Sequence, residues 1–219
     1  MVLIEERMHS IVQKYEAKDF SYFFDSLEGF SEKQLVLHYG LYEGYIKKVN
    51  EINEKLESAN LISANHNYSE YRNLLVDLSH NLNGVILHEL YFSNLTDKFT
   101  EYSEAFKMII ERDFGSIKHF TENFKAAGMA SRCGWAITGY NYRDGKIRNF
   151  AIDQHNLHVP VFVRPLLIMD TWEHAFGTDY GTDKKTYIDS FMKNINRHVV
   201  SLRFESALKA ETAHEIPEK

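Results

Sequence analysis

Apolar residues recur at helical spacing through two long segments in the first half of the chain. The first segment runs from Glu32 to Leu56, and its apolar and aromatic positions are Leu35, Leu37, Leu41, Tyr42, Tyr45, Ile46, Val49 and Ile52. Ser31 with Gln34 three residues later is a capping-box pattern, which is typical of a helix start. A second such segment runs from about Tyr71 to Phe92, after the polar stretch 58–68. The pattern predicts a hairpin of two long helices.

The second half of the chain has a different pattern. Two shorter helices are expected near 100–111 and 114–126, three strands near 134–140, 146–152 and 161–169, and further helices near 171–176 and 183–208. A turn signal, Arg143-Asp144-Gly145-Lys146, joins the first two strands. We therefore expect an α+β fold. An N-terminal α-hairpin domain (1–97) precedes a C-terminal α/β domain (98–219), which holds a small three-stranded antiparallel sheet flanked by helices.

Composition narrows the class of protein. The chain has 219 residues, of which 44% are hydrophobic and 26% charged, as in ordinary globular proteins. A net charge of -6 gives no reason to expect nucleic acid or an anionic membrane as a partner. No apolar run reaches membrane-spanning length, and the N-terminus lacks a signal-peptide pattern. Cys133 is the only cysteine, which excludes an internal disulfide and favours a cytoplasmic location. We expect it to be buried.

Eleven histidines motivate a search for a metal site. Asp170 follows an apolar strand and stands four residues before His174, so the pair could either hold an ion or cap a helix. His38 and His88 lie on the apolar faces of the two long helices, where an imidazole needs a hydrogen-bond partner or a metal. Either histidine alone is more often a satisfied core residue. Together, the three nitrogens and one oxygen suit iron, manganese or zinc.

The flanks of these four residues resemble those of the iron/manganese superoxide dismutases. The matching stretches are Leu35-x-x-His38-Tyr39-Gly40, Asn81-x-x-Gly84-x-x-x-His88-x-x-Tyr91, Pro165-Leu166-Leu167 and Asp170-x-Trp172-Glu173-His174-Ala175, within a resemblance that covers roughly 20–205. The resemblance implies one Fe or Mn ion per chain, ligated by His38, His88, Asp170 and His174 and by a solvent molecule. It also implies a homodimer with an antioxidant oxidoreductase activity, the dismutation of superoxide to dioxygen and hydrogen peroxide.

The resemblance also assigns a residue that tunes the metal. Gln154 lies 16 residues before Asp170, where the family carries a glutamine that hydrogen-bonds the metal-bound solvent. Gln154 together with Gly84 resembles the manganese-type arrangement. The alternative is that Gln154 is a surface loop residue. Its neighbours His155 and His158 could be extra ligands, but we expect them to be exposed to solvent.

Four further residues surround the expected site. Trp135 and Trp172 resemble the family's aromatic wall around the ligands. Glu173 resembles the glutamate that crosses the dimer interface to the partner's ligand histidine, although an acid at a helix start is also common. Lys184 stands where the family usually has an arginine at the substrate funnel, and a lysine could still attract a small anion.

The gateway, meaning the residues that control the passage of substrate and protons to the metal in this family, departs from the family pattern. Tyr42 occupies the place of a second histidine on the first helix, and Gly177 that of a tyrosine that reaches it across the dimer. The gate tyrosine is either replaced by Ile46 or shifted to Tyr45. We favour Tyr45 because the later Val49-Asn50 fits the family better with one residue deleted, and helix geometry allows it, since seven residues from His38 are close to two turns. The candidate catalytic residues are thus Tyr42, Tyr45 and Gln154. We hypothesise that Tyr42 fills the space vacated at Gly177, across an altered dimer interface.

These departures leave three functions open. The first is dismutation of superoxide with a modified proton path. The second is a metalloprotein of the same fold that carries out another oxygen-dependent redox reaction on superoxide or another small oxygen species. The third is a structural homologue without catalysis, because a fold does not guarantee a function.

Overall fold

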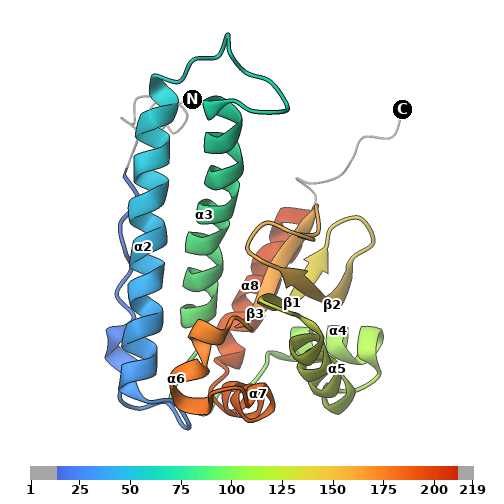
Figure 1. Ribbon diagram of the computed structural model, residues 1–219. Helices are drawn as coiled ribbons and strands as arrows, with labels where there is room; N and C mark the ends of the chain where they lie inside the picture. The colour runs from blue at the N-terminus through green and yellow to red at the C-terminus, as the bar shows by residue number, and fades with distance from the viewer. Residues whose placement is uncertain (1–13, 212–219) are drawn as a thin grey trace, which may run out of the picture.

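A hairpin of two long helices stands beside a smaller mixed domain in the computed structural model, which describes residues 14–211 (Figure 1). A short 3-10 helix, η1 (Ser21–Phe23), precedes the hairpin helices α2 (Glu32–Glu57) and α3 (Glu70–Ser93). Ser31 Oγ caps α2 by accepting from the backbone N–H of Gln34 at 3.1 Å. In a capping box, the side chain of Gln34 would accept from the backbone N–H of Ser31. Here that N–H donates instead to Asp179 Oδ2, at 2.7 Å.

The remaining elements form the C-terminal part of the fold. They are α4 (Glu104–Phe114), α5 (Ile117–Ala130), β1 (Gly134–Asn141), β2 (Lys146–Asp153), β3 (Val163–Asp170), η2 (Glu173–Ala175), α6 (Gly177–Tyr180), α7 (Lys184–Lys193) and α8 (Arg197–Ala210). The sheet is antiparallel in the order β2-β1-β3. The expected α+β fold is confirmed, while the domain boundary at residue 97 stays a prediction.

One expected helix is divided in two. The segment 183–208 was expected as a single helix, but α7 ends at Lys193 and α8 begins at Arg197. Asn194 and Asn196 cause the break, because their side chains bond to the backbone outside a continuous helix. Asn194 Nδ2 donates to the carbonyl of Glu28, and Asn196 Oδ1 accepts from the N–H of Val199 as the cap of α8.

Strand β3 brings the C-terminal part of the fold to the hairpin. It pairs with β1 along one edge, and both α3 and α8 contact it. Its residues 166–169 are all buried, which accounts for the continuous apolar run in the sequence. The strand ends at Asp170, beside the helices of the hairpin (Figure 1). None of the helices within residues 14–211 is both long and apolar enough to cross a membrane.

Candidate metal centre

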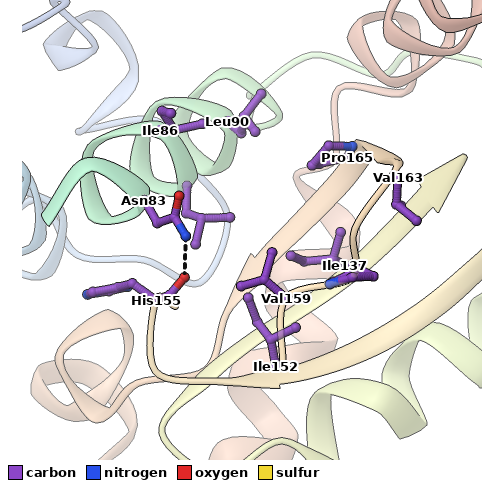
Figure 2. Close-up of a pocket in the computed structure, with 11 residues that line it drawn as sticks. Asn83, Ile86, Leu90, Ile137, Ile152, His155, Val159, Val163 and Pro165 are labelled. Atoms are coloured by element: carbon purple, nitrogen blue, oxygen red, sulfur yellow. Dashed lines mark hydrogen bonds between the residues drawn. The ribbon is translucent and has the colours of Figure 1, made fainter. Parts of the chain in front are cut away.

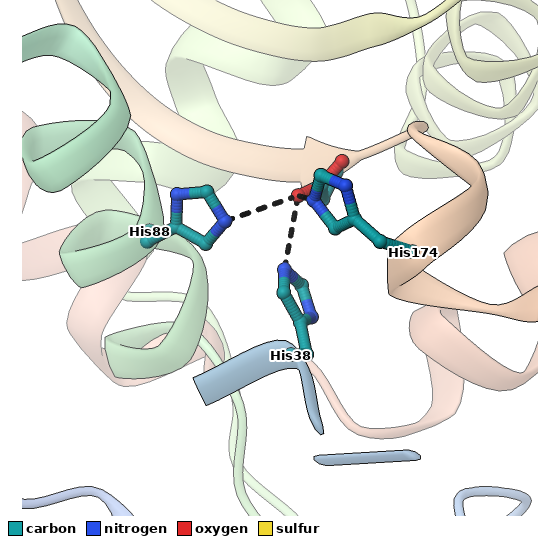
Figure 3. A group of neighbouring side chains, drawn as sticks. His38, His88 and His174 are labelled. Atoms are coloured by element: carbon teal, nitrogen blue, oxygen red, sulfur yellow. Dashed lines mark hydrogen bonds and ion pairs between the residues drawn. The ribbon is translucent and has the colours of Figure 1, made fainter. Parts of the chain in front are cut away.

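Four ligand-type side chains converge where β3 meets the hairpin. The candidate ligand atoms of His38, His88, Asp170 and His174 all lie within 4.8 Å of one another. Asp170 Oδ2 is 3.0 Å from His38 Nε2, 3.2 Å from His174 Nε2 and 3.7 Å from His88 Nε2. Figure 3 shows the three labelled imidazoles pointing at one carboxylate from three directions. The four residues named from the sequence therefore form one group.

Neighbouring bonds hold two of these side chains in a ligating orientation. His88 Nδ1 donates to the carbonyl of Gly84 at 2.6 Å, so its Nε2 is the unprotonated nitrogen. That Nε2 has no hydrogen-bond partner among residues 14–211. The backbone N–H of Trp172 donates to Asp170 Oδ1 at 2.8 Å, which leaves Oδ2 facing the histidines. A buried nitrogen without a partner, aimed at a carboxylate oxygen, fits a site that holds a metal.

The electrostatics of the group give the protonation states that a metal cation requires. Burial lowers the pKa of His38 and of His88, which keeps both imidazoles neutral. Burial alone would raise the pKa of Asp170, but the electrostatic interactions and hydrogen bonds that its carboxylate makes with the imidazoles of His174 and His38 outweigh burial and lower that pKa. Neutral imidazoles and an ionised carboxylate are the forms that bind a divalent or trivalent ion. The donor set of three nitrogens and one oxygen suits iron and manganese.

Gln34 positions the segment that carries His174. Its side chain is fully buried, although the sequence pattern assigned it only a role at the helix start. Gln34 Nε2 donates to the carbonyl of His174 at 2.6 Å, and Gln34 Oε1 accepts from the N–H of Thr178 at 2.9 Å. The amide thus ties α2 to η2, which fixes the candidate ligand His174 relative to the candidate ligands of the hairpin.

The structure corrects the expectation for His155 and places Gln154 at the surface. Gln154 is exposed, whereas His155, which was expected to face solvent, is fully buried. The reason is the turn after β2, where Gln154 has a φ of 56° and its N–H donates to the carbonyl of Cys133. This left-handed residue turns its own side chain outward and the next one inward. His158 is exposed as expected, with 67% of its side chain accessible.

His155 joins a tryptophan to the tyrosine of the gateway. Trp135 Nε1 donates to His155 Nδ1 at 3.0 Å, and His155 Nε2 lies 2.8 Å from the Tyr45 hydroxyl. An indole nitrogen can only donate, so Nδ1 is the accepting nitrogen and the neutral ring carries its proton on Nε2. His155 therefore donates to the Tyr45 oxygen, which leaves the hydroxyl proton of Tyr45 free to be donated elsewhere. Trp135 also contacts His88, with 5.1 Å between the ring centroids.

The same environment sets the protonation of this pair. Burial lowers the pKa of His155 to about 4, so its ring is neutral near pH 7. Burial and the negative charge of Asp170 raise the pKa of Tyr45 to about 12, so its hydroxyl is protonated. The pair thus enters any reaction at neutral pH as two neutral hydrogen-bonding groups, with a phenol proton available.

Tyr45, and not Ile46, faces the ligand group. The Tyr45 ring lies 5.3 Å from the His88 ring between centroids, while Ile46 is part of the apolar core. The ring occupies the space above Gly84, where a Cβ would meet ring atoms of Tyr45 at 2.9 Å. Of the two candidates for the gate, Tyr45 is thus the one beside the ligand group, and its role as the gate stays a prediction.

Tyr42 is enclosed by its own chain. Its side chain is fully buried, and its hydroxyl accepts from the N–H of Lys18 and donates to Glu89 Oε1, each at 3.0 Å. Lys18 also forms an ion pair with Glu89. A Cβ added at Gly177 would meet nothing within 4 Å, so that position borders open space. Within the chain, Tyr42 therefore does not fill the space at Gly177, and the part of the hypothesis that concerns a dimer interface stays a prediction.

The other expected site residues are placed less deeply. Trp172 is half-buried and stacks on His174, with ring centroids 5.8 Å apart. Glu173 is exposed. The Lys184 ammonium donates to the carbonyl of Ser131 at 2.6 Å, and burial lowers its pKa. Cys133 is exposed, contrary to expectation, because it precedes β1 in the turn that also contacts Gln154.

A small cavity also borders His155. Its volume is about 90 Å³, and it lies between α3 and the sheet, lined mostly by apolar side chains such as Ile86, Leu90 and Val163 (Figure 2). The carbonyl of His155 accepts from Asn83 Nδ2 at 2.9 Å at its edge. The cavity lacks the charged groups of the metal centre, which is a separate place in the fold.

Comparison with known proteins defines the class that this fold and site belong to. Residues 14–96 match the model of the iron/manganese superoxide dismutase alpha-hairpin domain, and residues 102–203 match that of the C-terminal domain. The chain belongs to the iron/manganese superoxide dismutase family.

Individual relatives agree with this assignment. The chain is 46% identical to "Superoxide dismutase [Fe]" of Aquifex pyrophilus over 193 residues, which cover 86% of this chain and 90% of the relative. It is 34% identical to "Superoxide dismutase [Fe]" of Cupriavidus metallidurans and 32% identical to "Superoxide dismutase [Mn] 1" of Halobacterium salinarum. The alignment with the Halobacterium protein covers 90% of this chain and 98% of that relative.

Proposed function

We propose that this protein dismutates superoxide to dioxygen and hydrogen peroxide, with one iron or manganese ion bound by His38, His88, Asp170 and His174. The observation that carries the proposal is that the three imidazoles meet at Asp170 Oδ2, with His38, His88 and Asp170 buried and His174 half-buried. Family membership supports the reaction. The names of the Aquifex and Cupriavidus relatives favour iron, and that of the Halobacterium relative keeps manganese open.

The metal would supply the one-electron redox chemistry, and the protein's own groups would supply orientation and protons. The N–H of Trp172 on Asp170 Oδ1 and the carbonyl of Gly84 on His88 Nδ1 hold the two ligands rigidly. Gln34 keeps the ligand histidine of the C-terminal domain against the hairpin. Rigid ligands favour one coordination geometry in both oxidation states, which limits reorganisation during electron transfer.

Tyr45 is the proposed proton donor on the approach to the ligands. Its hydroxyl accepts a hydrogen bond from His155, so its own proton can be donated to a peroxide anion. In this proposal His155, held by Trp135, orients the Tyr45 hydroxyl, and it occupies the inward place where the resemblance had put Gln154. The buried position and fixed tautomer of His155 support this replacement.

Attraction of the substrate and assembly belong to the same proposal. Superoxide is an anion, and the half-buried ammonium of Lys184 would favour its approach. Glu173 and Gly177 are not buried in the single chain, which leaves both available for a homodimer interface. The cytoplasmic location stays a prediction.

Metal analysis and a superoxide assay test this function together. Purified protein should contain about one iron or manganese ion per chain, and at least one of the two reconstituted metal forms should consume superoxide. Full metal content with negligible superoxide consumption would contradict dismutation and favour another oxygen-dependent reaction. An intact protein that binds neither metal would favour the structural role.

A further inference from the structure

His80 lies on the same side of α3 as the ligand His88. His80, Gly84 and His88 are spaced four residues apart, so they lie in a row on one face of the helix. The Tyr45 ring covers Gly84 in the middle of this row. Its centroid is 5.3 Å from that of His88 on one side and 6.2 Å from that of His80 on the other. His80 therefore flanks Tyr45 on the side away from the ligands.

The loop after β2 holds a second imidazole against His80. The ring centroids of His80 and His155 are 4.6 Å apart, which is a direct contact. Two side-chain bonds fasten this loop to α3 on either side of His80. Asn156 Nδ2 donates to Ser79 Oγ at 2.8 Å, and Asn83 Nδ2 donates to the carbonyl of His155 at 2.9 Å. The contact between the two rings is thus built into the fold.

The two imidazoles differ in their free nitrogens. Both nitrogens of His155 are engaged, one by Trp135 and the other by Tyr45, so it cannot exchange a proton without losing a partner. His80 has no side-chain hydrogen bond or ion pair to any part of the chain between residues 14 and 211, and it is half-buried, so it also meets solvent. The titratable groups packed against it are Tyr45 from α2 and His155 from the loop.

We propose that His80 returns protons from solvent to Tyr45 during turnover. The proposal rests on the proposed dismutation. When the Tyr45 O–H bond breaks and its proton passes to peroxide, the resulting phenolate takes one proton from the His80 imidazolium through a water molecule. His80 then takes one proton from bulk water, so each group ends as it began and no electron moves. Histidine suits this part because its imidazole can both donate and accept a proton.

Two substitutions in the full-length, metal-loaded protein test the proposal. His80→Phe keeps a ring against Tyr45 and His155 but removes both nitrogens, and His80→Gln keeps polarity without proton exchange. Both should lower kcat about tenfold or more while changing KM less, because proton transfer by a positioned group contributes at least that much. Added imidazole should restore kcat in both variants. His66→Gln, which changes an exposed histidine of the loop between α2 and α3, should leave kcat, KM and metal content unchanged.

A second measurement does not depend on turnover. Diethyl pyrocarbonate modifies accessible, unprotonated imidazoles, and peptide mapping by mass spectrometry should find His80 modified and His155 protected in the native protein. Protection of His80 would overturn the proposal, because its nitrogens would then be unavailable to solvent.

The kinetic outcomes separate this proposal from the function on which it rests. Unchanged kcat in a metal-loaded His80→Phe, or full activity in His80→Gln with a loss in His80→Phe alone, would overturn it, since the second result indicates packing. A wild-type protein that holds its metal but does not consume superoxide contradicts the proposed function itself, and with it this inference.

Discussion

The candidate ligand group and the residues that line the approach to it, Tyr45 and His155, are built in different ways. The candidate ligands His38 and His88 lie inside long helices, and Asp170 ends a buried strand, so regular elements set their positions. The approach depends on Tyr45 from a helix and His155 from a loop, joined by one hydrogen bond of 2.8 Å. Regular elements tolerate little change in register, whereas a loop can exchange the residue that faces inward. The two regions should therefore respond differently to substitution.

Asp170→Asn should have the largest effect, because it removes the anionic ligand. The amide can still accept from the N–H of Trp172, so the fold should persist while metal content falls at least tenfold. Metal analysis and circular dichroism would measure the two effects. Asp183→Asn, at the exposed N-cap of α7, is the matched control, since asparagine caps equally well. Normal metal content in Asp170→Asn would contradict the ligand assignment.

A pair of adjacent substitutions decides which residue after β2 serves the site. His155→Leu should lower superoxide consumption about 10–100-fold, because Tyr45 and Trp135 both lose their partner. Gln154→Asn should stay within about twofold of the wild type, because asparagine tolerates the left-handed conformation and the side chain at this position is exposed. The opposite ranking would restore the part first assigned to Gln154.

Acid should destabilise the metal-free protein through its buried histidines. Burial lowers the pKa of His38, His88 and His155 in the folded state, and that of His155 reaches about 4. The unfolded chain therefore binds more protons than the folded one below about pH 6.5, and stability falls as the pH drops from there towards 4. The loss should be of the order of a few kcal/mol in denaturant titrations. Equal stability of metal-free protein at pH 7 and pH 5 would contradict neutral buried imidazoles.

Two helical glycines offer the mildest comparison. Gly84→Ala places a Cβ 2.9 Å from the Tyr45 ring, so the ring must shift, and stability should fall by about 1–3 kcal/mol with a loss of activity of roughly tenfold or less. Gly40→Ala meets nothing within 4 Å and should stabilise the protein by about 0.5–1 kcal/mol. Thermal unfolding and activity of both variants would measure the contrast. Equal behaviour would mean that Tyr45 does not depend on the space above Gly84.

The sequence by itself predicted most of the elements of this protein and its candidate metal ligands. Helical periodicity located the hairpin, a continuous apolar run located β3, and the spacing of Asp170 and His174 pointed to the metal centre. These features are local, because a helix or a buried strand carries its own pattern of side chains. The break between α7 and α8 was missed, since the asparagines there act through bonds to Glu28 and to the next helix.

Only the tertiary structure decided which residues surround the approach to the candidate metal centre. The left-handed conformation of Gln154 turns the side chain of His155 inward, and no periodic pattern in the sequence marks such a turn. The packing of α2 on α3 placed Tyr45 over Gly84, and the loop after β2 brought His155 against His80. These contacts join residues that are distant in the chain. Their partners follow from how the elements pack, which the order of amino acids within one element does not reveal.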